Sequence, residues 1–392
     1  MEKFIPLSIP NFEGNEEKYV VDAISSTFVS TVGGYVSRME RELASFLNVD
    51  NVAVCQSGTS ALHLALIDAG VMPGDVVLVP PLTFIAAVNP VKYQFATPVF
   101  IDCDDSFCLD PNKLRSFCEE ECEWDGAELK HKGAVVKAIV AVHVFGNMAD
   151  MEAIMNIAEK YSLKVIEDAT EALGTKYLAG KYAGKYAGTI GDYGCYSFNG
   201  NKIITTGGGG AVTARDFEAV DHIRFLSTQA KTDPHFYIHD EVGYNYRMTN
   251  LQAALGVAQL EELPEFIKRK QKNYELYKAE FDDFKYGKLM PFREGTDANK
   301  WFYSIEIDRE HIKATMREII TTLEKDKIQT RAIWGLINEQ RPYKGEETYK
   351  LERASYYVER ILNIPSSTQI TEDEIRYVAA KVKERLEEFA NG

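Results

Sequence analysis

The sequence predicts an α/β fold with one large, mostly parallel sheet and a smaller α+β domain at the C-terminal end. Between about Val52 and Thr213, short runs rich in β-branched residues alternate with segments of helical apolar spacing, which is typical of a parallel sheet. After Gly243 the pattern changes to long helical stretches. The length of 392 residues fits one large domain with a smaller companion.

Seven strands are expected in the large sheet. They are predicted at Val52–Val54, Val76–Val79, Pro98–Ile101, Val135–Val142, Lys164–Glu167, Tyr193–Ser197 and Ala211–Thr213. Helices between them are predicted at Ala61–Ala69 and Met151–Tyr161 from the spacing of their apolar residues. The stretch from Ser116 to Lys132 is polar and charged, so we expect an exposed excursion there.

The domain boundary is expected near residue 248, with a large domain over 1–248 and a second domain over 249–392. A long helical pattern begins at Met248, and Pro264 predicts a kink within it. One strand is expected at Trp301–Ile307. Thr371 followed by Glu374 predicts a capping box before a final amphipathic helix.

Composition excludes several classes of function. A formal net charge of -15 argues against a nucleic-acid binder, whose affinity depends on clustered Lys and Arg. The first ten residues lack a signal pattern, and no uncharged apolar run is long enough to cross a bilayer, so we expect a cytoplasmic protein. The six cysteines are expected to be free thiols. Cys118 and Cys122 could share a metal, but no second pair of ligands lies nearby, so no metal site is predicted.

A candidate anion site follows the first predicted strand. Ser57, Gly58 and Thr59 stand in CQSGTSALHLAL, between a short apolar strand and an apolar helix. Hydroxyl groups and backbone N–H groups at a helix N-terminus favour an anion such as phosphate. An ordinary N-cap explains the same residues.

Two further segments carry reactive groups after predicted strands. Glu167 and Asp168 end an apolar strand at the edge where open α/β sheets bind ligands. Lys202 follows the next strand in a loop with Ser197, Asn199 and then four consecutive glycines, which permit close backbone approach. A helix cap and a solvated lysine at a hairpin tip are the structural alternatives. Together, however, the three segments supply a phosphate cup, a carboxylate and a lysine, which are the parts of a pyridoxal-phosphate site.

Six ordered motifs resemble the sugar-nucleotide aminotransferases of the DegT/StrS family. This family has the aspartate aminotransferase fold, fold type I of pyridoxal-phosphate enzymes. The motifs are SGTSALHLAL, GDVVLVPPLTFIAAVNPV, AVHVFGNMADM, VIEDATEALG, YSFNGNKIITTGGGGAV and GYNYRMTNLQAALGVAQL. They extend over essentially the whole chain, so the resemblance implies the family's fold and its cofactor, pyridoxal 5'-phosphate.

The resemblance also implies roles for individual residues. Lys202 carries the cofactor and moves protons, Asp168 pairs with the pyridine nitrogen, and Phe84 stacks on the ring. Glu171, where many members have Gln or His, lies near the phenolic oxygen, and Asn199 stands at a variable position of the cofactor site. The phosphate is bound by a group of small residues, Ser57, Gly58, Thr59 and Ser197.

The resemblance further implies a homodimer with composite sites. Asn245 in GYNYRM would reach the cofactor phosphate of the neighbouring subunit. Arg247 and Arg331 are candidates for binding the diphosphate of a nucleotide, and an ion pair or a surface charge is the alternative for each. Thr31 and Tyr35 are candidate sugar contacts.

The expected reaction passes an amino group from L-glutamate to a 4-keto-6-deoxy sugar linked to UDP or GDP. The loop NGNKIITTGGGG and the insertion before KAIVAVHVFGN resemble enzymes of legionaminic acid synthesis most, with perosamine-type and bacillosamine-type enzymes as alternatives. A related branch catalyses sugar 3-dehydration with histidine in place of the lysine, so Lys202 argues against it. A non-enzymatic regulator built on this fold is a further alternative, but such a protein would not need an intact cofactor site.

Overall fold

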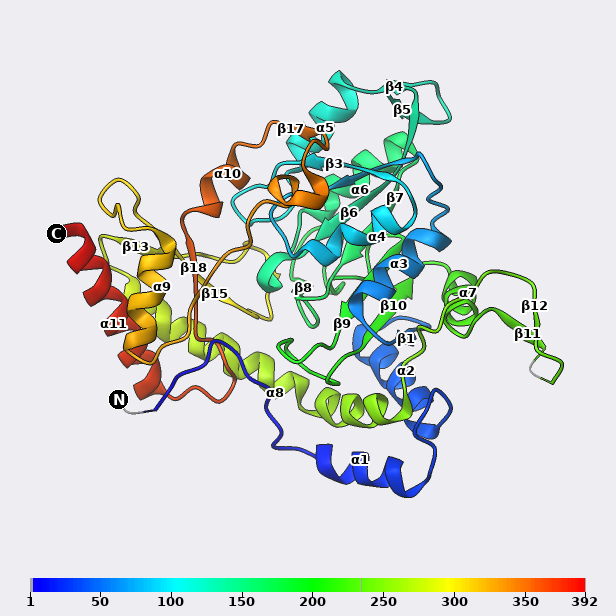
Figure 1. Ribbon diagram of the computed structural model, residues 1–392, viewed down its shortest axis with the longest axis horizontal. Coiled ribbons are helices and arrows are strands. Elements are labelled where there is room, and N and C mark those ends of the chain that lie inside the picture. Colours follow the sequence, from blue (N-terminus) through cyan, green and yellow to red (C-terminus); the bar gives the residue numbers. More distant parts are fainter. Residues whose placement is uncertain (1–2, 234, 392) are drawn as a thin grey trace.

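The computed structural model describes residues 3–233 and 235–391, and its largest element is one sheet (Figure 1). The strand order is β1-β10-β9-β7-β6-β2-β3-β17, with β5 beside β6 and β4 beside β5. The strands are β1 Ala53–Cys55, β2 Val76–Val79, β3 Thr97–Ile101, β4 Glu123–Trp124, β5 Leu129–His131, β6 Ala134–Val142, β7 Lys164–Asp168, β9 Tyr193–Ser197, β10 Gly210–Ala214 and β17 Thr348–Tyr349.

The centre of this sheet is parallel, as the sequence predicts. Strands β9, β7, β6, β2, β3 and β17 pair in parallel, whereas β10 and β1 add antiparallel strands at one edge. All seven predicted strands are present with ends within one residue of those expected. The strands β4, β5 and β17 were not predicted, because these pieces of two or three residues, unlike β1, lie in no run of apolar β-branched residues.

Helices cover the large sheet and connect its strands. Helix α3 packs against β9 and β10, α7 packs against β1 and β10, and α6 packs against β7 and α5. The helices of this part are α1 Glu16–Ser25, α2 Gly34–Leu47, α3 Gly58–Asp68, α4 Asn89–Tyr93, α5 Pro111–Glu120, α6 Met151–Tyr161, α7 Phe217–Ser227 and α10 Arg353–Val358. The remaining short strands form two ladders, β11 Lys231–Asp233 with β12 Ile238–His239, and β8 Lys176–Tyr177 with β14 Thr296–Asp297.

The polar stretch from Ser116 to Lys132 is only partly exposed, which corrects the expectation of an exposed excursion. It contains the end of α5, where Phe117 and Cys118 are buried. It also contains the β4–β5 hairpin, where Leu129 and His131 are buried. The charged residues that suggested exposure occupy the outer face of an amphipathic helix and the hairpin turn.

A second, smaller sheet lies at the other end of the long helix α8, Asn250–Phe281 (Figure 1). Its order is β13-β15-β18-β16, from strands Gly287–Leu289, Tyr303–Ile307, Ile361–Ile364 and Arg331–Ala332. Helices α9 Met316–Lys325 and α11 Glu372–Asn391 pack with it. Helix α8 remains helical on both sides of Pro264. The capping box is confirmed, since the Thr371 N–H donates to Glu374 Oε2 at 3.0 Å and the Glu374 N–H donates to Thr371 Oγ1 at 3.2 Å.

Two hydrophobic cores correspond to the two sheets. The larger one fills the space around the large sheet, and the smaller one lies between the small sheet, α8, α9 and α11. A segment late in the sequence returns to the larger core, with Leu336, Tyr343 and Tyr357 buried there. A division of the chain at residue 248 therefore stays a prediction, because part of the C-terminal half packs with the large sheet. This return brings β16 close to the carboxyl ends of the large sheet's strands.

Candidate active site

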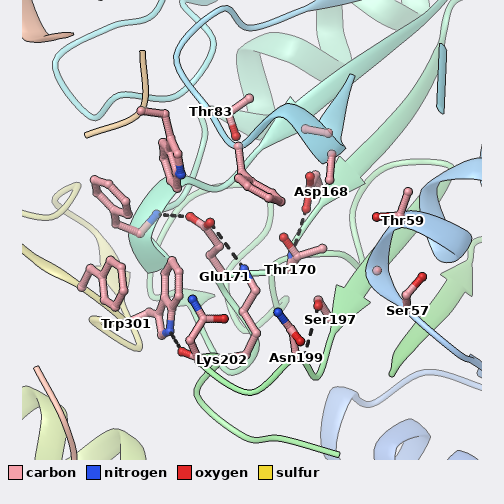
Figure 2. Close-up of a pocket in the computed structure, with 18 of the residues that line it drawn as sticks. Ser57, Thr59, Thr83, Asp168, Thr170, Glu171, Ser197, Asn199, Lys202 and Trp301 are labelled. Atoms are coloured by element: carbon pink, nitrogen blue, oxygen red, sulfur yellow. Dashed lines mark hydrogen bonds and ion pairs between the residues drawn. The ribbon is translucent and has the colours of Figure 1, made fainter. Parts of the chain in front are cut away.

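A cavity of about 480 Å³ lies where β7 and β9 end, next to the N-terminus of α3, and β16 contributes Arg331 and Ala332 to its lining. Figure 2 shows residues that line it. Asp168 is the last residue of β7 and Ser197 is the last residue of β9. The two strands are parallel neighbours, so their carboxyl ends meet at one edge of the sheet, where α/β folds bind ligands. Ten residues predicted to bind the cofactor or substrate line this one cavity: Ser57, Gly58, Thr59, Phe84, Asp168, Glu171, Ser197, Asn199, Lys202 and Arg331.

One end of the cavity is an anion cup at the start of α3. Ser57 is the N-cap, and its Oγ accepts the Ser60 N–H at 3.0 Å. Free N–H groups of a first helical turn attract an anion. Figure 2 shows Ser57, Thr59 and Ser197 gathered on this side of the cavity.

Glycines allow the backbone to close around the cup. A Cβ added at Gly58 would lie 2.7 Å from Ser197 Cβ, and one added at Gly210 would lie 2.4 Å from the Ser57 carbonyl oxygen. Gly207 has φ +78°, which favours glycine. The run of four glycines therefore serves the close approach that the sequence suggested.

Asp168 is buried at the end of β7. Its Oδ1 accepts the Thr170 N–H at 3.1 Å, and burial raises the pKa of the carboxyl. Within residues 3–233 and 235–391, no Lys, Arg or His forms an ion pair with it. A buried carboxylate without a cationic partner costs free energy, which a positively charged ring nitrogen would relieve.

Lys202 and Glu171 point toward each other across the cavity (Figure 2). The Lys202 Nζ donates to Glu171 Oε1 at 3.5 Å, and both side chains are nearly enclosed. Burial raises the pKa of Glu171, while the nearby Lys202 ammonium opposes this rise. The other carboxylate oxygen, Oε2, accepts the Phe145 N–H at 2.8 Å. Glu171 therefore connects the reactive amine to the backbone of Phe145.

Aromatic rings form the remaining wall, and sequence reasoning missed them. The Trp301 ring lies 4.4 Å from the Lys202 Nζ and stacks on Phe302 at 3.9 Å between ring centroids. Phe145 stacks on Trp334 at 4.7 Å. Phe145 has φ 58°, which is costly for a residue with a bulky side chain. The chain has only three tryptophans, so two of them in the motifs NKWFYS and RAIWGL were a usable signal.

Four predicted site residues do not line this cavity. The Arg247 guanidinium forms the ion pair that was its alternative role, since it donates to Glu40 Oε1 at 2.5 Å and to the Val54 carbonyl at 3.2 Å, and its contact with a diphosphate stays a prediction. The Tyr35 hydroxyl donates to Asp22 at 2.9 Å. Thr31 and Asn245 also lie outside the lining. Asn245 is exposed, and its contact with a neighbouring subunit stays a prediction.

Among the described residues, no group of three or more His, Cys, Asp or Glu side chains is placed to hold a metal ion. None of the helices in the described part of the chain is long and apolar enough to span a membrane.

The residues present fit pyridoxal phosphate. The cup at α3 fits its phosphate, the unpaired buried Asp168 fits its ring nitrogen, and the amine of Lys202 lies between them and the aromatic wall. Phe84 is 54% exposed beside the cavity, which leaves its ring free for stacking. Each group lies on a different element, so the fold rather than a local motif brings them together.

Comparisons with known proteins agree with this geometry. Residues 10–383 match the model of the DegT/DnrJ/EryC1/StrS aminotransferase family. The chain is 35% identical to the putative pyridoxal phosphate-dependent aminotransferase EpsN of Bacillus subtilis, over 95% of this chain and 94% of EpsN. It is also 35% identical to the GDP-perosamine synthase of Escherichia coli O157:H7, over 97% and 98%.

A solved structure supports the fold. The Helicobacter pylori aminotransferase PseC, involved in the biosynthesis of pseudoaminic acid, superimposes with a TM-score of 0.88 at 23% identity, covering 99% of this chain and 100% of PseC. The chain thus belongs to the DegT/DnrJ/EryC1/StrS aminotransferase family and is a pyridoxal-phosphate-dependent sugar aminotransferase.

Proposed function

We propose that the protein transfers an amino group from L-glutamate to the keto carbon of a nucleotide-linked 4-keto-6-deoxy sugar. UDP- and GDP-4-keto-6-deoxy-N-acetylglucosamine are the first candidates. One observation carries this proposal: the Lys202 amine lies in an aromatic-walled cavity between Glu171 and Trp301, with Arg331 at the rim.

Lys202 is the residue that moves protons. When bound, pyridoxal phosphate supplies an aldehyde that takes up the amino nitrogen and a ring that delocalises negative charge. The Lys202 amine lines the cavity beside Glu171 and Trp301, where it can deliver a proton to the former keto carbon of the sugar. Glu171 Oε1, 3.5 Å away, keeps the amine in place. Asp168, at the end of β7, supplies the negative charge that a protonated ring requires.

The aromatic wall keeps water away from these groups. Trp301 and Phe302 are buried, and their stacked rings close the cavity on the side of the small sheet. A water-poor cavity strengthens each electrostatic contact inside it.

Arg331 is the proposed contact for the nucleotide diphosphate. It is exposed at the rim, in β16, and forms no ion pair with the described residues. The protein carries a net charge of -15, so a dianionic substrate needs a local cation such as this one. A panel of substrates is required to identify the sugar and base.

Two substrate branches have support. A sugar of the legionaminic acid pathway is supported by the NGNKIITTGGGG loop and the insertion before β6. A perosamine-type sugar is supported by the 35% identity with a GDP-perosamine synthase over nearly the whole of both chains. A bacillosamine-type sugar stays a third possibility.

We further propose that the active unit is a homodimer. Asn245 is exposed and lies outside its own cavity, next to Thr228 in an isolated β-bridge. An isologous interface would bring the same residue of each subunit to the other's phosphate cup.

The test is a substrate panel. The protein is incubated with L-glutamate, pyridoxal phosphate and a set of UDP- and GDP-linked 4-keto-6-deoxy sugars, and products are identified by mass and NMR. One sugar should gain an amino group while 2-oxoglutarate forms in equal amount, and Lys202→Ala should make neither product. Release of 2-oxoglutarate without amination of any sugar in the panel would contradict the proposed substrate class.

A further inference from the structure

Lys270 is a buried lysine that the chemistry described above does not use. It lies in α8, and its side chain is only 2% exposed. Its Nζ donates to the Trp301 carbonyl at 2.9 Å and to the Ser366 carbonyl at 2.5 Å. The Ser366 Oγ also donates to the Trp301 carbonyl, at 3.0 Å. The amine thus joins the loop that enters β15 to the loop that leaves β18.

Lys270 is poorly explained as a contributor to stability alone. Burial lowers its pKa to about 7, so the charged form is costly in this place. A neutral amine still has two N–H donors for the two carbonyls. A leucine or methionine would fill the same volume without the cost of dehydrating an amine. Compared with either apolar residue, lysine adds only the two hydrogen bonds to the Trp301 and Ser366 carbonyls.

Trp301, whose carbonyl accepts the hydrogen bond from Lys270, lies next to the Lys202 amine. The Trp301 ring lies 4.4 Å from the Lys202 Nζ, and its indole N–H donates to the Asn201 carbonyl at 2.8 Å, one residue before Lys202. The Trp301 backbone N–H donates to Asn299 Oδ1 at 3.0 Å. The indole is therefore fixed from the small sheet by its backbone and from the catalytic loop by its ring.

We propose that Lys270 is a positioning residue for transamination: by holding the Trp301 carbonyl it fixes the Trp301 indole against the Lys202 loop. A residue of the long helix α8 thus determines the position of the aromatic ring beside the Lys202 amine. The inference depends on the aminotransferase activity of the family and not on which sugar is the substrate.

The direct test observes Trp301 itself. The protein has three tryptophans, so selective ¹⁵N labelling gives three indole N–H signals, and the Trp301→Phe spectrum assigns one of them. In Lys270→Met, the Trp301 signal should shift and its exchange with solvent should increase about tenfold or more, because the indole is released from Asn201. The signal of Trp124, which lies in β4 outside the cavity, serves as the internal reference.

The activity test is the half-reaction with L-glutamate, followed through the visible absorbance of the cofactor-loaded enzyme. Lys270→Met should lower the maximal single-turnover rate about tenfold and change the glutamate concentration for half-maximal rate less than threefold. Lys270→Gln keeps an N–H donor and should fall between wild type and Lys270→Met in both measurements. Lys268→Met, at an exposed position of the same helix, should match the wild type.

Clear outcomes overturn the proposal. It is wrong if the Trp301 signal of Lys270→Met is unchanged, or if the signal moves while the rate stays within twofold of wild type. If Lys270→Met does not fold, Lys270→Gln decides by the same criteria. A wild-type enzyme that does not react with L-glutamate would refute the proposed donor, whereas the indole measurement would still decide the role of Lys270.

Discussion

Replacing Asp168 with asparagine should leave the cofactor bound and slow turnover by about 10²-fold to 10³-fold. Asparagine has the same shape and keeps an oxygen acceptor for the Thr170 N–H, which Asp168 Oδ1 accepts at 3.1 Å. The substitution thus removes the charge and exchanges one carboxylate oxygen for an amide NH2 group. Removing one preorganised electrostatic partner in a buried site costs about 3–4 kcal/mol of transition-state stabilisation, which gives this range.

The assay measures cofactor content and turnover separately. Content is measured by absorbance after gel filtration, and it should stay above half of the wild-type value because the phosphate cup at Ser57 is untouched. The control is Asp216→Asn, an exposed N-cap of α7 where asparagine caps equally well. Turnover of Asp168→Asn within threefold of wild type would refute the reasoning and leave Asp168 as a turn residue.

Two other predictions concern charge and assembly. Burial raises the pKa of Asp168, so in the absence of cofactor the folded chain keeps this proton to a higher pH than the unfolded chain does. The free energy of unfolding therefore falls as the pH rises from about 4 through the raised pKa. Urea unfolding of cofactor-free protein should therefore show Asp168→Asn gaining stability over wild type as the pH rises above about 4. A stability difference that stays constant with pH contradicts this. In the assembly experiment, Lys202→Ala subunits mixed with subunits carrying an inactivating Asn245→Ala change should regain activity, because one of the two sites then has both residues intact. Proven heterodimers without activity would contradict a site shared between the two subunits.

Local patterns predicted much of the fold. Every strand of four or more residues in the large sheet is visible as an apolar run between turn residues, since burial on both faces demands such residues. The return of β17 to that sheet was not predictable, because Thr348–Tyr349 pairs with β3 through tertiary contacts that no nearby sequence reveals.

The site also contains residues that the sequence predicts and residues that it does not. Ser57, Asp168 and Lys202 follow strand ends, so their convergence at one edge follows from the parallel topology. Trp301 reaches the cavity from the small sheet, across an interface that the sequence does not specify. The ion pair of Arg247 could not be predicted either, because its partner Glu40 lies over two hundred residues away in the chain.

The central claim is that Lys202 carries the cofactor and performs the proton transfer. The most direct measurement is borohydride reduction of the cofactor-loaded enzyme followed by peptide mass spectrometry, since reduction makes a C=N link between a lysine and the cofactor aldehyde permanent. We predict loss of the visible absorbance and a single modified peptide with the adduct on Lys202. An adduct on another lysine, such as the buried Lys270, or no adduct in a fully loaded enzyme, would contradict the account.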